Sequence, residues 1–174
     1  MGAQIAKHNA KTLRKSKNSA TRPPPSCNCQ KSKLQEDPLY CPIPGACNQD
    51  GVVYQTTVTT TNNNQELYVG SAKNFKSRYY THKSSLLEKK TDGKTTLSSY
   101  FWKKVEEGSA PTVSWKILEA NLPTYNPVSR VCRLCLREKF NITLNPHLAT
   151  LNSRREIFAH CRHMRWKLIV DPPD

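Results

Sequence analysis

The sequence predicts an α/β fold in which a small, mainly antiparallel three-stranded sheet is flanked by helices. Two observations predict the sheet: two β-branched and aromatic runs, at 52–58 and 66–70, flank a polar turn, and an alternating segment follows at 111–118. A third observation, apolar residues spaced three and four positions apart, predicts helices between and after these strands. The order expected along the chain is β-β-α-α-β-α-α, an α/β layer whose sheet is covered by helices.

The first two strands are expected to form a hairpin. Residues 52–58 read Val-Val-Tyr-Gln-Thr-Thr-Val, and residues 66–70 read Glu-Leu-Tyr-Val-Gly, which suits a pleated surface. The segment between them contains three consecutive Asn residues, which favour turns. Each strand carries one tyrosine, Tyr54 or Tyr68, so the two phenols are expected on neighbouring strands.

The helix expected after this hairpin can be capped by Asn74 or by Ser71, because either side chain can accept from a backbone N–H of the first turn. Its apolar and aromatic positions recur at helical spacing. They are Phe75, Tyr79, His82, Leu86 and Leu87.

Three further helices are expected. Residues 97–105 and 131–144 have helical patterns, and residues 153–161 predict a last short helix capped by Asn152 or Ser153. No internal repeat is evident, so a single folded domain is expected rather than a repeat array.

The chain divides into three parts by composition. Residues 1–26 form a basic linker that ends in three consecutive prolines, and residues 27–50 form a Cys-rich segment with little apolar material to bury. Such a segment needs a metal to become ordered. Residues 51–170 contain all the expected strands and main helices and form the predicted catalytic domain.

The net charge indicates a polyanionic partner. Twenty-seven Lys and Arg residues against 13 Asp and Glu residues leave a formal charge of +14. Nucleic acid is the first candidate, since neutralising phosphates releases condensed counterions. No segment approaches the roughly 20 consecutive apolar residues of a membrane helix. We therefore expect an intracellular protein, with the nucleus favoured over the cytoplasm, and no membrane partner.

One group of side chains resembles the motif of a known nuclease family. Val52-Val53-Tyr54 and Tyr68-Val69-Gly70 resemble the Gly-Ile-Tyr and Tyr-Ile-Gly strands of GIY-YIG nucleases, and the run from Tyr68 to Arg78, followed by His82, resembles phage intron-homing enzymes. The departures are Val52 at the position of the family's Gly, although Gly51 lies beside it, and a long hairpin loop.

The second half of the chain resembles the endonuclease branch of Penelope-like retroelements. The resemblance rests on the segments around Cys132 and Glu138, around Asn152 and around Cys161, together with the upstream cysteines. It implies an endonuclease that nicks DNA to leave a 3′-hydroxyl for an associated reverse transcriptase, with no small-molecule cofactor.

The resemblance also implies a role for each site residue. Tyr54 would be the general base or a water-positioning phenol, with Tyr68 hydrogen-bonding nearby. Because a free phenol has a pKa of about 10, Tyr54 needs a cation beside it, which Arg78 supplies. Glu138 would be the single carboxylate that holds catalytic Mg²⁺ or Mn²⁺, an ion that keeps several waters. Asn152 would orient the metal shell or the scissile phosphate.

Each of these roles has a simpler alternative. Glu138 is alternatively a solvated helix carboxylate paired with a nearby Arg or Lys, and Asn152 is alternatively a helix N-cap. His82 lies four residues after Arg78 on the same helix face. It either touches the phosphate, assists proton transfer, or is a partly buried, hydrogen-bonded imidazole.

Two structural zinc sites are expected, because paired cysteines in a reducing compartment are typical metal ligands. One site would be formed by Cys132, Cys135, Cys161 and His163, with His160 as a substitute for Cys161 or His163. The alternative is that Cys135 and Cys161 are ordinary buried thiols. The second, less regular site would be formed by Cys27, Cys29, Cys41 and Cys47, or by Cys41 and Cys47 with a histidine.

Several basic residues would line the approach of DNA and contact its phosphates. They are Lys73, Lys76, Lys83, Arg154 and Arg155. Two rival functions remain at this point. One is a zinc-stabilised nucleic-acid-binding module without nuclease activity, and the other is a repair nuclease of the same fold that recognises branched DNA.

Overall fold

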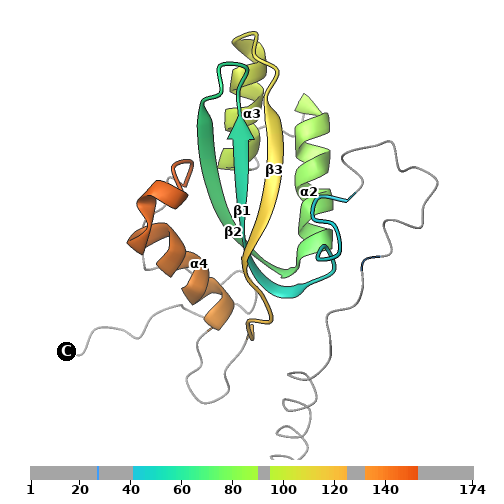
Figure 1. The fold of residues 1–174 in the computed structure, drawn as a ribbon, viewed down its shortest axis with the longest axis vertical. Coiled ribbons are helices and arrows are strands. Elements are labelled where there is room, and N and C mark those ends of the chain that lie inside the picture. Colours follow the sequence, from blue (N-terminus) through green and yellow to red (C-terminus); the bar gives the residue numbers. More distant parts are fainter. Residues whose placement is uncertain (1–26, 28–40, 90–94, 125–131, 153–174) are drawn as a thin grey trace, which may run out of the picture.

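One antiparallel sheet of three strands forms the centre of the molecule (Figure 1). The computed structural model describes residue 27 and residues 41–89, 95–124 and 132–152. The strands are β1 (Asp50–Thr59), β2 (Gln65–Asn74) and β3 (Thr112–Glu119), arranged in the order β2-β1-β3. The predicted fold class is confirmed, and β1 lies in the middle of the sheet.

Helices cover both faces of the sheet. They are α2 (Phe75–Leu87), α3 (Thr96–Glu106), α4 (Arg133–Leu144) and the short η3 (Pro146–Leu148). The helices predicted at the positions of α2, α3 and α4 are therefore confirmed, whereas the helix predicted at 153–161 lies outside the described residues. Within the described ranges, no helix has the length and apolar character that crossing a membrane requires.

The side chains of β1 point alternately to the two faces of the sheet, and each face has its own hydrophobic core. Val52 and Tyr54 point to the face covered by α2 and pack with its Phe75 and Tyr79. Val53 points to the other face and packs against residues of α4. Successive side chains of a strand face opposite ways, so this alternation decides on which side of the sheet each site residue lies.

β2 is longer than the sequence predicted. It was expected to end at Gly70, but its pairing with β1 continues to Asn74, which lies opposite Asp50. The Asn74 side chain accepts a hydrogen bond from Ser77 N at 3.0 Å and so caps α2. Ser71, the alternative cap, lies inside β2. The helix therefore begins directly where the strand ends, which fixes α2 relative to the sheet.

Gly51 explains why Val52 is tolerated in the first motif strand. Its φ angle is +56°, and a Cβ at this position would collide with the backbone oxygen of Leu122. Leu122 N donates to Gly51 O at 2.9 Å, so the two backbones are in direct contact. Position 51, directly before Val52, therefore requires glycine.

The outer edge of β2 is paired with a short segment from the end of the described chain. Leu151 N donates to Leu67 O at 2.8 Å, and Leu67 N donates to the Thr150 hydroxyl at 2.8 Å. The Asn152 amide completes the pattern, because Oδ1 accepts from Val69 N and Nδ2 donates to Val69 O, each at 2.8 Å. The Asn152 side chain thus makes the two backbone hydrogen bonds that a residue of a neighbouring strand would make.

We expect Asn152→Ala to lower the free energy of unfolding by about 1–3 kcal/mol, because it removes two hydrogen bonds and leaves the Val69 backbone groups without partners. Urea unfolding measures this loss. Asn62→Ala, in the exposed hairpin loop, is the matched control and should change stability little. Equal losses in the two variants would contradict the role of Asn152 as a clamp.

Candidate active site

Tyr54 is the centre of a cluster of rings on the α2 face of the sheet. Its side chain is fully buried, with 0 % of its surface exposed. The ring packs edge-to-face against Phe75 at 5.6 Å between centroids and lies 5.9 Å from Trp115. These contacts hold the phenol ring in one orientation, so the position of its hydroxyl is fixed by packing.

The Tyr54 hydroxyl lies between two residues of α2. Arg78 Nε donates to Tyr54 Oη at 3.2 Å, and His82 Nε2 lies 2.8 Å from the same oxygen. Because a guanidinium only donates, the hydroxyl accepts from Arg78, and its own proton can be donated to His82 when Nε2 is the unprotonated ring nitrogen. The expected placement of Arg78 and His82 on one helix face is confirmed, and both side chains converge on Tyr54.

Gly70 provides the space that the phenol occupies. It pairs with Tyr54 across the β1–β2 ladder, and a Cβ on it would lie 2.5 Å from Tyr54 Oη and 2.7 Å from Cζ. Any larger residue would push the hydroxyl away from Arg78 and His82. The glycine of the Tyr68-Val69-Gly70 segment is therefore required by a close approach between the strands.

Tyr54 and His82 are both uncharged at neutral pH. Burial raises the pKa of Tyr54 well above its usual range, Tyr68 adds to this effect, and Arg78 partly opposes it. Burial and, to a lesser extent, the positive charge of Arg78 together lower the pKa of His82 to about 3. The resting pair is thus a neutral phenol hydrogen-bonded to a neutral imidazole.

Tyr68 and Arg78 form the more accessible part of the cluster, since both are half-buried. The Tyr68 ring lies 6.5 Å from the Tyr54 ring and 5.9 Å from the His82 ring. Burial lowers the pKa of Arg78, but the hydroxyls of Tyr54 and Tyr68 outweigh burial and raise it. Arg78 therefore carries its charge between the two tyrosines.

Glu138 reaches the cluster from the other side of β2. It lies on α4, and its Oε2 accepts a hydrogen bond from the Ser71 hydroxyl at 2.6 Å. Its charge is close enough to Tyr54 to raise the phenol's pKa. A half-buried single carboxylate suits Mg²⁺, which takes few protein ligands and retains water. The sequence did not identify Ser71, although its position after Gly70 places it on the face opposite Tyr54.

The observed contacts of Asn152 are with the backbone of Val69 rather than with another of the expected site residues. Val69 lies between Tyr68 and Gly70, so the amide holds the segment of β2 that carries the motif. Asn152 therefore acts on the site indirectly, by holding β2 in place. The helix for which it was the alternative cap lies outside the described residues.

Three cysteine sulfurs form a cluster beside the α2 layer. The Sγ atom of Cys27 lies 3.5 Å from that of Cys41 and 3.0 Å from that of Cys47, and all three lie within 4.8 Å of one another. The cluster packs against the core that contains Tyr54 and Phe75. Three converging thiols are a suitable ligand set for a zinc ion. Cys29, the fourth expected ligand, lies outside the described residues.

The second expected zinc site is described only in part. Cys132 and Cys135 are buried at the start of α4 and belong to the core beneath that helix. Cys161 and His163 lie outside the described residues. The position of this pair means that any ligand shared by both cysteines would fix the N-terminal turn of the helix that carries Glu138.

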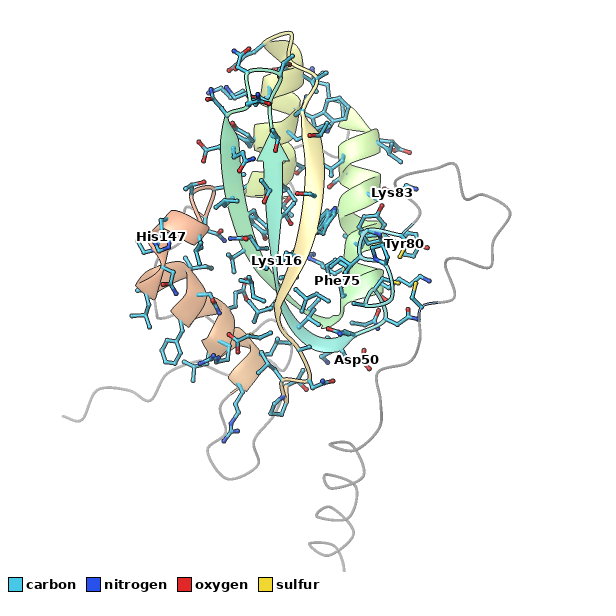
Figure 2. All side chains as sticks on the ribbon, viewed as in Figure 1. Asp50, Phe75, Tyr80, Lys83, Lys116 and His147 are labelled. Atoms are coloured by element: carbon cyan, nitrogen blue, oxygen red, sulfur yellow. The ribbon has the colours of Figure 1, made fainter. Side chains whose placement is uncertain are left out.

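Three of the basic residues expected to contact DNA, Lys73, Lys76 and Lys83, lie on or just before α2. Lys73 is exposed, and Lys76 and Lys83 are half-buried. Figure 2 shows Lys83 along α2 near Tyr80. Arg154 and Arg155 lie outside the described residues.

Comparison with known families identifies part of the chain. Residues 51–122 match the model of the GIY-YIG catalytic domain. This domain defines a family of nucleases, and the match covers Tyr54, Tyr68, Arg78 and His82. Glu138 and Asn152 lie beyond its end. Comparisons with curated proteins and with solved structures give no match.

The depressed pKa of His82 makes a prediction about stability at acid pH. The unfolded imidazole takes up a proton near pH 6.5, whereas the folded one does so near pH 3. Between these values the unfolded chain binds more protons, so the free energy of unfolding should fall as pH decreases, by up to about 1.4 kcal/mol per pH unit from this group.

Denaturation between pH 7 and pH 4 tests this expectation. His82→Gln should show a shallower decrease than wild type, whereas His147→Gln, which alters an exposed ring on η3, should keep the wild-type slope. The same slope for wild type and His82→Gln would refute the buried, neutral state of His82.

Proposed function

We propose that the chain is a metal-dependent endonuclease that hydrolyses one phosphodiester bond of DNA, leaving a nick with a 3′-hydroxyl. The observation that carries this proposal is the Tyr54 hydroxyl held between Arg78 Nε at 3.2 Å and His82 Nε2 at 2.8 Å. A phenol with a proton acceptor on one side and a cation on the other can exchange protons with a bound water.

In the proposed reaction Tyr54 Oη removes a proton from the attacking water while its own proton passes to His82 Nε2. Because Tyr54 gains one proton as it loses another, the phenol ends neutral, and Arg78 Nε–H stabilises the partial negative charge that the phenol oxygen carries during the transfer. The same guanidinium can bind phosphate oxygens of the substrate, since it offers five donors. The water oxygen bonds to phosphorus as the bond from phosphorus to the 3′ oxygen breaks; that oxygen takes up a proton from solvent to become the 3′-hydroxyl, and His82 then returns its proton to solvent.

The burial of Tyr54 requires a movement before reaction. With 0 % of the side chain exposed, water cannot reach the Tyr54 hydroxyl in the present arrangement. A substrate phosphate bound by the other N–H groups of the guanidinium would shift Arg78 enough to admit a water to Tyr54 while Nε–H stays within reach of the phenol oxygen. Substrate binding and activation of the base would then be coupled through a single side chain, which limits reaction with water when no DNA is bound.

Glu138 is the residue proposed to hold the divalent cation. Its contact with Ser71 orients one carboxylate oxygen, and its negative charge contributes to the raised pKa of Tyr54. When bound, Mg²⁺ or Mn²⁺ would neutralise charge on the phosphate and on the leaving oxygen. Tyr68, Arg78 and Tyr54 would supply the hydrogen bonds that position the phosphate beside it.

The biological setting proposed for the nuclease is a Penelope-like retroelement, in which a reverse transcriptase extends the nicked strand from its 3′-hydroxyl. The support is the resemblance of the residues around Cys132, Glu138 and Asn152 to that branch, together with the net charge of +14. A nuclear location follows from this role, because the target DNA is chromosomal.

We also propose a structural zinc ion at Cys27, Cys41 and Cys47, with Cys29 as the fourth ligand. Thiolates around a tetrahedral zinc lie about 3.8 Å apart, as follows from a Zn–S distance of about 2.3 Å. The observed separations of 3.0 and 3.5 Å need little adjustment to reach this value. Phe75 N donates to Gln49 O at 3.0 Å, so the segment after Cys47 is tied to the start of α2.

Nicking of supercoiled plasmid in the presence of Mg²⁺ tests the proposed activity. Tyr54→Phe, Arg78→Ala and Glu138→Gln should each lower the rate by at least about 100-fold, because each removes the base, the cation or the metal ligand. Tyr68→Phe should have a smaller effect, since Tyr68 assists rather than accepts the proton.

Two variants serve as matched controls for nicking. Tyr80→Phe removes an exposed phenol hydroxyl of α2, and Glu106→Gln removes an exposed carboxylate of α3, so both should nick like wild type. Equal rates in all variants would overturn the assignment. Binding without cleavage would identify an inert nucleic-acid-binding module, and preference for flaps or junctions over duplex would identify a repair nuclease.

Removal of the first cysteine cluster should release about one zinc ion per chain. Cys47→Ser, which alters the buried member of the cluster, should lower the zinc content by about one and reduce nicking, since the cluster packs against the Tyr54 layer. Metal analysis after exhaustive dialysis measures the content. Cys29→Ser should show the same loss if Cys29 is the fourth ligand, and unchanged zinc in Cys47→Ser would exclude this site.

A further inference from the structure

Two polar atoms in the described part of the chain are buried without a hydrogen-bond partner: Nδ1 of His82 and Oγ1 of Thr56. Their residues expose 1 % and 0 % of their surface. A buried polar group without a partner is unfavourable, and native structures contain few of them. A single group that hydrogen-bonds to both atoms would satisfy both.

Thr56 lies in the sheet among side chains that also surround the His82 ring. In the sheet, Thr56 pairs with Tyr68 on β2 and with Trp115 on β3. Tyr54 precedes it by two residues and so lies on the same face.

These three neighbours are also the rings that surround His82. The His82 ring centroid lies 6.0 Å from that of Tyr54, 5.9 Å from that of Tyr68 and 5.4 Å from that of Trp115. Tyr54, Tyr68 and Trp115 are therefore neighbours of both Thr56 and His82. The two atoms without partners therefore belong to buried side chains that share the same three neighbours.

The hydrogen bonds of Tyr54 decide which His82 nitrogen carries the proton. Tyr54 Oη accepts from Arg78 Nε, so its own proton is available to His82 Nε2. If Nε2 instead carried the proton, the hydroxyl would accept from both residues and its own proton would have no acceptor among the described contacts; in the arrangement that satisfies every donor Nε2 is therefore the acceptor, and the neutral imidazole carries its proton on Nδ1. In this tautomer Nδ1 is a donor that requires an acceptor, and a hydroxyl oxygen is a suitable one.

We propose that Thr56 Oγ1 receives the Nδ1–H of His82 through one buried water and thereby keeps His82 in the tautomer that can accept the proton of Tyr54. A single water can donate to the hydroxyl while it accepts from the imidazole. When Nε2 gains the Tyr54 proton, Nδ1–H remains bonded and the imidazolium charge is partly compensated. Thr56 is thus a positioning residue, and its effect on cleavage rests on the proposed function.

The tautomer can be measured directly by ¹⁵N NMR of the imidazole at neutral pH. In the wild-type protein, Nδ1 of His82 should be protonated and Nε2 should not. In Thr56→Val, which keeps the β-branched shape but lacks the hydroxyl, the Nε2–H form should become substantial and nicking should fall about tenfold. Thr56→Ser should restore both. Thr57→Val, on the opposite face of β1, should change neither.

The tautomer measurement and the nicking assay together separate failure of this inference from failure of the proposed function. A wild-type His82 with its proton on Nε2 overturns the inference without any variant, and so does an unchanged tautomer in Thr56→Val. If wild type does not nick but the tautomer shifts as expected, the role of Thr56 stands and the proposed function fails. Loss of nicking with an unchanged tautomer would show that Thr56 acts on the sheet alone.

Discussion

The contact of the Tyr54 phenol with Gly70, Arg78 and His82 is the constraint on which the rest of the site depends. The phenol lies across the neighbouring strand only because Gly70 has no side chain, and a methyl group there would lie 2.5 Å from its oxygen. Arg78 and His82 reach that oxygen because α2 starts directly after β2. Strand pairing, helix position and hydrogen bonding are thus satisfied together or not at all.

Local sequence predicted the half of the site that is built from local structure. The hairpin and α2 place Tyr54, Tyr68, Arg78 and His82, and the family match covers the same residues. The sequence could not predict the tasks of Asn152 and Ser71. Asn152 binds Val69 across 83 residues, and Ser71 binds Glu138 across 67 residues, so only the folded chain brings these partners together. The extension of β2 was missed for a related reason, since it depends on pairing with β1.

The site draws on both faces of the sheet. Tyr54 and α2 lie on one face, whereas Glu138 and α4 lie on the other and reach the site beside β2. Cys132 and Cys135 belong to the core under α4, and Cys27, Cys41 and Cys47 pack on the α2 layer. Cys132 and Cys135 are therefore on the side of the sheet that carries Glu138, and Cys27, Cys41 and Cys47 are on the side that carries Tyr54. Burial of α4 through Leu134 and Ile142 holds the Glu138 carboxylate against Ser71 of β2.

The pairing of residues 150–152 with β2 has a consequence beyond the site. β2 is an edge strand, and unpaired edge strands offer backbone groups to which another chain can add, which is a route to aggregation. Here the outward groups of Leu67 and Val69 are occupied by Thr150, Leu151 and Asn152. The segment that fixes the motif strand also closes that edge to foreign strands. Removal of residues 150–152 would expose the backbone groups of β2. It would also release the strand that positions Tyr68.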